Sequence, residues 1–180
     1  MQPRKQHLVD TALTLFNQYG YHATGIDLIL AQSKVSKATL YKHFRSKDEL
    51  ILAVLEQRHN QILAMFNSKV EQAALKGSHP LLGIFDALDE WFNSDEFYGC
   101  NFINASAEYA ASLDPIHVFA AQHKQAIVDL IKTQLTATET NQAEQISLLI
   151  EGAIVMAHTR GIKNSALTAK IMAQYLISTS

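Results

Sequence analysis

Apolar residues recur along most of this chain at intervals of three and four positions, which places them on one face of an α-helix. Near the N-terminus, Leu8, Ala12, Phe16 and Tyr19 form such a stripe, and Gly20 ends it. No stretch alternates convincingly between apolar and polar residues, as a half-buried β-strand would. The pattern therefore predicts an all-α protein with about nine helices.

Capping residues, glycines and prolines delimit the other eight predicted helices. Thr24 is expected to cap the second helix and Ser36 the third, and Ser46-x-x-Glu49 is a capping box for the fourth. The third to ninth helices are predicted at about 36–44, 47–75, 80–93, 101–111, 115–135, 141–160 and 165–177.

The segment 34–47 contains five basic residues and no acidic one. Leu40 and Phe44 lie four residues apart, so the segment contains an amphipathic helix whose opposite side carries Ala38 and Lys42. Lysine amines, a methyl group and hydroxyls are suited to guanine, thymine and phosphates respectively. Two helix N-termini nearby also favour phosphate. The segment therefore points to DNA.

The charge of the chain is unevenly distributed. The formal net charge is −2, but residues 1–62 carry eight Lys and Arg against five Asp and Glu, whereas the remainder carries seven against twelve. A basic N-terminal third on an acidic body is the distribution that a DNA-contacting head requires.

Composition and motifs exclude several other classes of protein. With 48% hydrophobic residues the chain is globular, and its single cysteine, Cys100, excludes an internal disulfide and fits a reducing cytosol. No signal core or membrane-spanning stretch is found, so we expect a cytoplasmic protein with no membrane partner. Catalytic motifs and clustered metal ligands are also missing from the sequence, so we expect no enzyme activity, catalytic residue, metal or cofactor.

The pairs Leu15-Phe16 and Gly20-Tyr21, the run Val35-Ser36-Lys37 and the sequence TLYKHFRSK at 39–47 together resemble the DNA-binding domain of tetracycline-repressor (TetR) type regulators. The resemblance covers roughly residues 2–62 and implies a helix-turn-helix near 25–44. It also implies two groups of DNA-binding residues, with Ser36 capping the reading helix. Phosphates would be held by Thr24, Tyr41, His43 and Lys47, and bases would be faced by Lys37, Ala38, Thr39 and Lys42.

The sequence departs from the family pattern at two positions. Lys34 stands where family members usually carry Gly in the turn, and Leu30 stands where they usually carry a small residue. The turn residue normally has a positive φ, which costs a non-Gly residue on the order of 1 kcal/mol. We therefore expect Lys34 to be strained if it keeps the left-handed geometry.

The body shows a second, shorter resemblance to one branch of the family, in GCNFINASAEY at 99–109, His123-Lys124 and EGAIV at 151–155. It implies an inducer cavity among the body helices. Glu108 and Glu151 could place two carboxylates in that cavity. Alternatively, only one of them faces a polar ligand. The candidate effector-binding residues are Phe66, Trp91, Phe92, Asn101, Phe102, Asn104, Glu108, Tyr109, His123 and Glu151.

The last two predicted helices carry apolar stripes, which either cap the core of their own chain or build a two-fold four-helix interface. The family resemblance favours a homodimer. The candidate dimerisation residues are Ile146, Ile150, Ile154 and Ala157 on one helix and Leu167, Ile171 and Tyr175 on the other.

These observations predict a helix-turn-helix DNA-binding domain at 2–62 and a helical effector-binding and dimerisation domain at 63–180. The protein is interpreted as a repressor that binds a palindromic operator as a homodimer and is released by a small-molecule effector. One alternative is a DNA-binding regulator without an inducer. Another is a helical ligand-binding or enzymatic protein whose basic head serves another purpose, and the motif at 39–47 argues against it.

Overall fold

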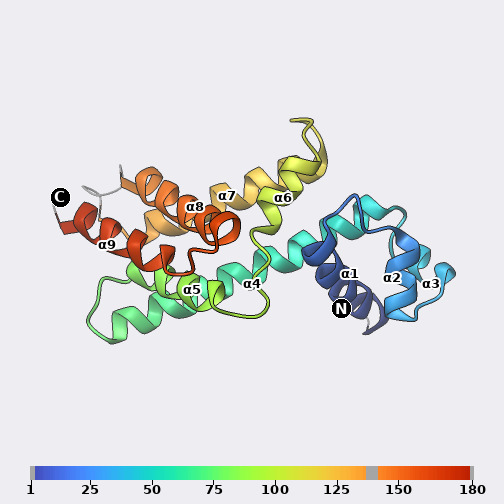
Figure 1. Ribbon diagram of the computed structural model, residues 1–180, viewed down its shortest axis with the longest axis horizontal. Helices are drawn as coiled ribbons and strands as arrows, with labels where there is room; N and C mark the ends of the chain where they lie inside the picture. Colours follow the sequence, from blue (N-terminus) through green and yellow to red (C-terminus); the bar gives the residue numbers. More distant parts are fainter. Residues whose placement is uncertain (1–2, 137–141, 179–180) are drawn as a thin grey trace. The chain divides into compact units, whose positions relative to one another are not determined.

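The computed structural model describes residues 3–136 and 142–178, and within these ranges it contains nine α-helices and no β-strand (Figure 1). The all-α prediction is therefore confirmed. The helices are α1 (Pro3–Tyr19), α2 (Ile26–Ser33), α3 (Lys37–His43), α4 (Lys47–Leu75), α5 (Leu82–Phe92), α6 (Asn101–Glu108), α7 (Pro115–Thr133), α8 (Ala143–Arg160) and α9 (Ser165–Ser178).

The chain divides into two compact units. Unit 1 contains residues 1–60 and 100–123, and unit 2 contains residues 61–99 and 124–180. The first segment of unit 1 ends close to the predicted domain boundary at residue 62, but unit 1 also includes α6 and the first half of α7. The assignment of the domains to 2–62 and 63–180 stays a prediction.

Unit 1 is built around a three-helix head, in which α1 packs against α2 and α3 (Figure 1). The apolar stripe of α1 provides the interior of the head, with Leu8, Val9 and Phe16 almost completely buried. Gly20 ends α1 with a φ of 85°, as the sequence predicts. The head is a helix-turn-helix, since the short turn 34–36 joins α2 to α3.

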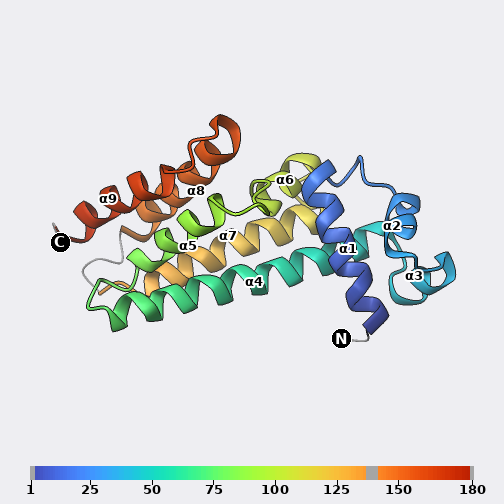
Figure 2. The ribbon, with the colours of Figure 1, turned by 60° about the horizontal axis from the view of Figure 1, so that its bottom comes forward.

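Unit 2 contains a layer in which α9 packs against both α5 and α8 (Figure 2). The buried residues of α9 are all small, namely Ser165, Ala166, Ala169 and Ala173, and the Ser165 hydroxyl donates to the Ala153 carbonyl of α8 at 2.8 Å. Helix α5 approaches α4 so closely that a Cβ at Gly83 would lie 2.2 Å from the Lys69 carbonyl oxygen. These contacts fix α5, α8 and α9 as one packed layer.

Lys34 is the one non-glycine residue with a positive φ in the described ranges, with φ 54° and ψ 25°. It follows α2 directly and carries the left-handed geometry that family members usually assign to glycine. The strain expected from the sequence is therefore present in the turn of the helix-turn-helix.

Replacing Lys34 by Gly should stabilise the protein by about 0.5–1 kcal/mol, because relief of the left-handed strain exceeds the extra entropy of the unfolded chain. The measurement is the urea midpoint followed by circular dichroism. Lys37→Gly makes the same change at a helical position and should destabilise the protein by about 0.5–1 kcal/mol. A Lys34→Gly protein less stable than the parent would contradict the prediction.

Candidate DNA-binding site

Helix α3 presents a polar face to solvent and anchors its other face in the head. Leu40 is fully buried and Phe44 is 3% exposed, whereas Lys37, Ala38 and Lys42 are exposed. The orientation predicted from the spacing of the apolar residues is therefore confirmed. Tyr41 is exposed beside this face, and Thr39 and His43 are half-buried.

The N-terminus of α3 is capped as predicted. The Ser36 hydroxyl accepts a hydrogen bond from the Thr39 backbone N–H at 3.2 Å, and the two side-chain hydroxyls lie 2.9 Å apart. The cap satisfies one of the amides that a helix start leaves without an intrahelical partner. It fixes the start of α3 directly after the strained turn.

The capping box of α4 forms with one change of partner. The Ser46 hydroxyl accepts from the Glu49 backbone N–H at 3.2 Å, as such a box requires. The Glu49 carboxylate, however, accepts from the Arg45 backbone N–H at 2.5 Å, one residue before the expected amide. The side chain of Glu49 thereby ties the first turn of α4 to the segment that follows α3.

Lys47 lies at the start of α4 and is half-buried, with its Nζ donating to the His22 carbonyl at 3.5 Å. Burial lowers the pKa of Lys47, while the negative charges of Asp48 and Glu108 act in the opposite direction. The amine is thus placed by the α1–α2 loop at the edge of the head.

The structure corrects two expectations for Thr24. This residue does not cap α2, because the cap position is Gly25 and no side chain bonds to the helix start. The Thr24 side chain is fully buried, and its hydroxyl lies 2.7 Å from the Gly20 carbonyl and 3.3 Å from the Leu15 carbonyl. The hydroxyl therefore fixes the loop after α1 from inside the head and is not presented to a phosphate.

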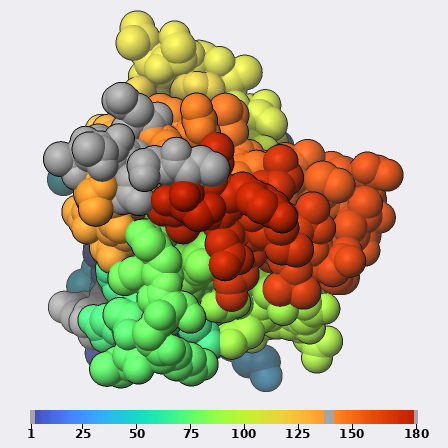
Figure 3. Space-filling model, turned by 90° about the vertical axis from the view of Figure 1, so that its left-hand side faces the viewer, coloured from blue at the N-terminus to red at the C-terminus, as the bar shows by residue number. Residues whose placement is uncertain are grey.

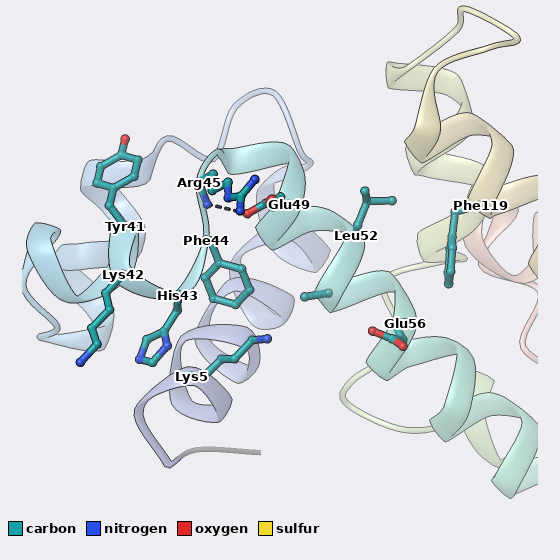
Figure 4. A pocket seen from close by; sticks show the side chains of 11 residues that line it. Lys5, Tyr41, Lys42, His43, Phe44, Arg45, Glu49, Leu52, Glu56 and Phe119 are labelled. Atoms are coloured by element: carbon teal, nitrogen blue, oxygen red, sulfur yellow. Dashed lines mark hydrogen bonds between the residues drawn. The ribbon is translucent and has the colours of Figure 1, made fainter.

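Two grooves flank the end of α3 within unit 1. One, of about 780 Å³, is lined by cations from α1 and α3 and by two carboxylates of α4, Glu49 and Glu56 (Figure 4). In it the Lys5 amine lies 5.3 Å from the centre of the Phe44 ring, which holds the start of α1 against the end of α3. The other groove, of about 460 Å³, is lined by Pro3, Arg4, Thr39, Lys42 and His43.

The sequence pattern did not assign Arg4 and Lys5 to the DNA-binding site. Both belong to the first turns of α1, and the grooves place them beside Lys42 and His43. Their positive charge was the available signal, but the packing of α1 against α3 is needed to relate them to the reading helix. Carboxylates repel phosphates, so Glu49 and Glu56 mark the acidic side of this surface.

The predicted effector residues are distributed over both compact units. In unit 1, the rings of Phe102 and His123 stack at 3.6 Å with an angle of 12°, and His123 Nδ1 lies 3.0 Å from His59 Nδ1. Asn101 is buried and Asn104 is half-buried in the same unit. Phe66, Trp91 and Phe92 are buried in unit 2.

The two predicted effector carboxylates are both occupied by protein partners. Glu151 accepts from Lys124, with 2.8 Å to each carboxylate oxygen. Glu108 accepts from backbone amides of the α1–α2 loop, and Tyr109 lies against the His22 ring. The structure does not bring Glu108 and Glu151 together within one unit, and their role as effector ligands stays a prediction.

The predicted dimerisation residues divide into a buried and an exposed group. On α8, Ile146, Ile150, Ile154 and Ala157 are at most 5% exposed and belong to the interior of unit 2. On α9, Leu167, Ile171 and Tyr175 are 44%, 56% and 68% exposed. The four α8 residues are therefore not accessible to a second copy. The residues of α8 that are accessible are Leu148, Gly152 and Val155, which form an exposed stripe.

Figure 3 looks onto α8 and α9, drawn in orange to red, which lie side by side on this surface. Leu167, Ile171 and Tyr175 recur every four positions along α9, so they share one face of the helix, and the exposed Met172 lies beside them. A Cβ at Gly152 would meet nothing within 4 Å, so the close approach that this glycine permits is not used within the chain.

Other functional groups do not converge in the described ranges. Among residues 3–136 and 142–178, no three His, Cys, Asp or Glu side chains are placed to hold a metal ion. Cys100 is buried at the start of α6. No helix in the part of the chain that the structure describes has the length and apolar character needed to cross a membrane.

A three-helix head with an exposed, basic reading helix, followed by further helices, defines the class of helical regulators that carry an N-terminal helix-turn-helix. Residues 8–54 match the family described as bacterial regulatory proteins, tetR family. The match identifies residues 8–54, which hold α2, α3 and most of α1, as the segment that is characteristic of this family.

Individual relatives agree with this assignment. The HTH-type transcriptional regulator UidR of Escherichia coli K12 is 33% identical over 70 residues, which cover 39% of this chain and 36% of UidR. The chain thus spans about a third of the length of this curated relative. The crystal structure of SCO4454, a TetR-family regulator from Streptomyces coelicolor, is 28% identical and has a TM-score of 0.88, covering 98% of this chain and 89% of SCO4454.

The fold is also shared with the multidrug binding protein EbrR, whose crystal structure contains malachite green. That structure is 17% identical, has a TM-score of 0.76, and covers 97% of this chain and 98% of EbrR. At this identity the likeness concerns the fold alone.

Proposed function

We propose that the protein is a transcriptional repressor that binds a palindromic operator as a homodimer. The observation that carries the proposal is the exposed face of α3, where Lys37, Ala38 and Lys42 stand opposite the buried Leu40. A helix of this kind fits the major groove, where lysine amines meet guanine acceptors and an alanine methyl meets thymine.

The neighbouring residues support a backbone-binding role. Tyr41 is exposed beside the reading face, and Lys47 and His43 lie half-buried at its end. Arg4 lines the groove next to Lys42 and adds a further cation at the edge of α3. Such contacts position a regulator on DNA without reading its sequence.

A second copy is supported by the exposed apolar stripes of α8 and α9. Two-fold symmetry pairs one patch with itself, and a stripe that recurs every four residues on α9 suits packing between helices. A dimer presents two reading helices to one face of the duplex. We therefore expect half-sites about 34–36 Å apart, or one helical turn.

The proposal is tested by selection from a random duplex DNA library, with wild-type protein as the binder. We expect enrichment of a palindromic sequence with this half-site spacing. Enrichment of a single asymmetric half-site would contradict binding as a homodimer. The absence of any enriched sequence would contradict operator binding.

Release by a small-molecule effector is the second part of the proposal. It is supported by the fold that the chain shares with EbrR, which was crystallised with malachite green. The buried His123 side chain of unit 1, which stacks on Phe102, is suited to orient a ligand. A screen for compounds that release bound operator distinguishes this regulator from one without an inducer, for which no compound would change the affinity.

Two lysine substitutions should separate base reading from phosphate binding. Lys42→Ala should relax specificity by about 1–3 kcal/mol at one symmetric base pair, because the amine faces a base edge. Lys47→Ala should weaken all sequences alike. The measurement is the affinity for a set of operators with single symmetric changes, and Lys76→Ala, at an exposed position in unit 2, serves as control. A uniform loss in both variants would show that Lys42 does not read a base.

A further inference from the structure

The end of α6 holds the loop between α1 and α2 through the carboxylate of Glu108. The Glu108 Oε1 accepts from the Tyr21 backbone N–H at 2.9 Å, and Oε2 accepts from the His22 backbone N–H at 2.6 Å. Hydrogen bonds to a charged carboxylate are about twice as strong as neutral ones. One side chain thus satisfies two consecutive amides of the loop.

Further contacts of Glu108 and Tyr109 hold the His22 side chain. His22 Nε2 lies 2.9 Å from the Glu108 carbonyl oxygen, and since this oxygen only accepts, Nε2 carries the proton. The His22 ring also packs on the Tyr109 ring at 4.7 Å. At Gly20 a Cβ would lie 3.0 Å from Glu108 Oε1, so this glycine leaves room for the carboxylate.

The start of α6 is tied to the same part of the head. The Tyr21 hydroxyl donates to the Asn101 carbonyl at 3.1 Å, and the Asn101 side-chain amide donates to the Asn17 side chain. Burial raises the pKa of the Tyr21 phenol, which keeps it protonated as a donor. Both ends of α6 therefore contact α1 or the loop that follows it.

The loop that Glu108 holds also binds Lys47, which is a candidate phosphate-binding residue. The His22 carbonyl accepts from Lys47 Nζ at 3.5 Å, and no other hydrogen bond from this amine is shown among the described residues. Glu108, His22 and Lys47 thus form a continuous chain of contacts within unit 1, from the last residue of α6 to the first residue of α4.

We propose that Glu108 is a positioning residue of the DNA-binding head, which orders the α1–α2 loop and thereby directs Lys47 toward the operator backbone. The inference rests on the proposed function. It assigns to Glu108 a place in DNA binding rather than in an effector pocket. Lys47 is the group that contacts the phosphate, and Glu108 acts only through the loop.

The test is a double-mutant cycle with Glu108→Gln and Lys47→Ala in the full-length chain, using the operator selected with wild-type protein. The amide of glutamine cannot accept from both loop N–H groups, so Glu108→Gln should lose about tenfold in affinity. The plot of log affinity against log salt should also lose about 0.9 in slope for each phosphate contact given up. In the Lys47→Ala background, Glu108→Gln should change the affinity by no more than about twofold.

Glu144→Gln, at an exposed position in the first turn of α8, makes the same change of charge and should leave both quantities unaltered. Additive effects of the two substitutions, or an unchanged salt slope in Glu108→Gln, would overturn the proposal even though the wild type binds DNA. Failure of the wild type to bind any DNA would instead overturn the proposed function.

Hydrogen exchange keeps the proposal testable if Glu108→Gln does not fold. In the wild type, the amides of Tyr21 and His22 should exchange slowly although they lie in a loop. Glu108→Asp keeps the charge but shortens the side chain by one methylene, and it should accelerate exchange at these two amides. Fast exchange of both amides in the wild type would overturn the proposal.

Discussion

Ile171→Glu should convert the proposed dimer into a monomer and lower operator affinity by about 10²–10⁴, the gain that linked binding of two modules provides. Ile171 is 56% exposed at the centre of the apolar face of α9, so a carboxylate there is solvated in the monomer. In a dimer it would be buried in an apolar seam, at a cost of several kcal/mol unless it is paired. Light scattering and circular dichroism should show a helical monomer.

Two further variants make this result specific to the proposed surface. Leu113→Glu introduces the same charge at a residue that is 90% exposed in the α6–α7 connection, and it should remain dimeric. Ile154→Glu places a carboxylate at a residue that is 5% exposed inside unit 2, so it should lose helical structure as well as dimerisation. A stable dimer in Ile171→Glu would show that the dimer interface lies on another surface.

The positions of most helices could be predicted because capping residues, glycines and prolines near each end determine where a helix begins and ends. The limits of α4 were predicted at 47 and 75, where a capping box starts the helix and a glycine follows its end. Such features depend only on residues that are close in the chain, so they can be predicted from a single sequence. At Lys34 the sequence marks an unusual residue in the turn but leaves the sign of φ open, and the structure is needed to show that the turn is left-handed.

Features that depend on distant partners could not be predicted in the same way. Glu108 was assigned to an effector pocket, but its hydrogen-bond partners lie 86 and 87 residues away in the chain. Two apolar stripes on α8 have helical spacing. One contains Ile146, Ile150 and Ile154, and the other contains Leu148 and Val155. Only the packing against α5 and α9 decides which of them faces inward.

Operator binding should depend strongly on salt, with a loss of about a thousandfold or more between about 50 and 200 mM salt if each dimer neutralises roughly 6–10 phosphates. The cations available in each copy are Lys37, Lys42 and Lys47 from the head, with Arg4 beside α3. Each contact releases counterions from the duplex, and this gain disappears as the salt concentration rises.

The slope of this dependence identifies the residues responsible. Lys37→Ala and Lys47→Ala should each remove two cations per dimer, but the slope should decrease by about 1.8 only for a residue that contacts phosphate in both half-sites. Lys76→Ala removes an exposed cation from unit 2 and should leave the slope unchanged. Because residues 63–180 carry seven basic against twelve acidic groups, the body should add no phosphate contacts of its own. A salt-independent affinity for the selected operator would contradict the assignment of Lys47 to the DNA backbone and the electrostatic role of the basic head.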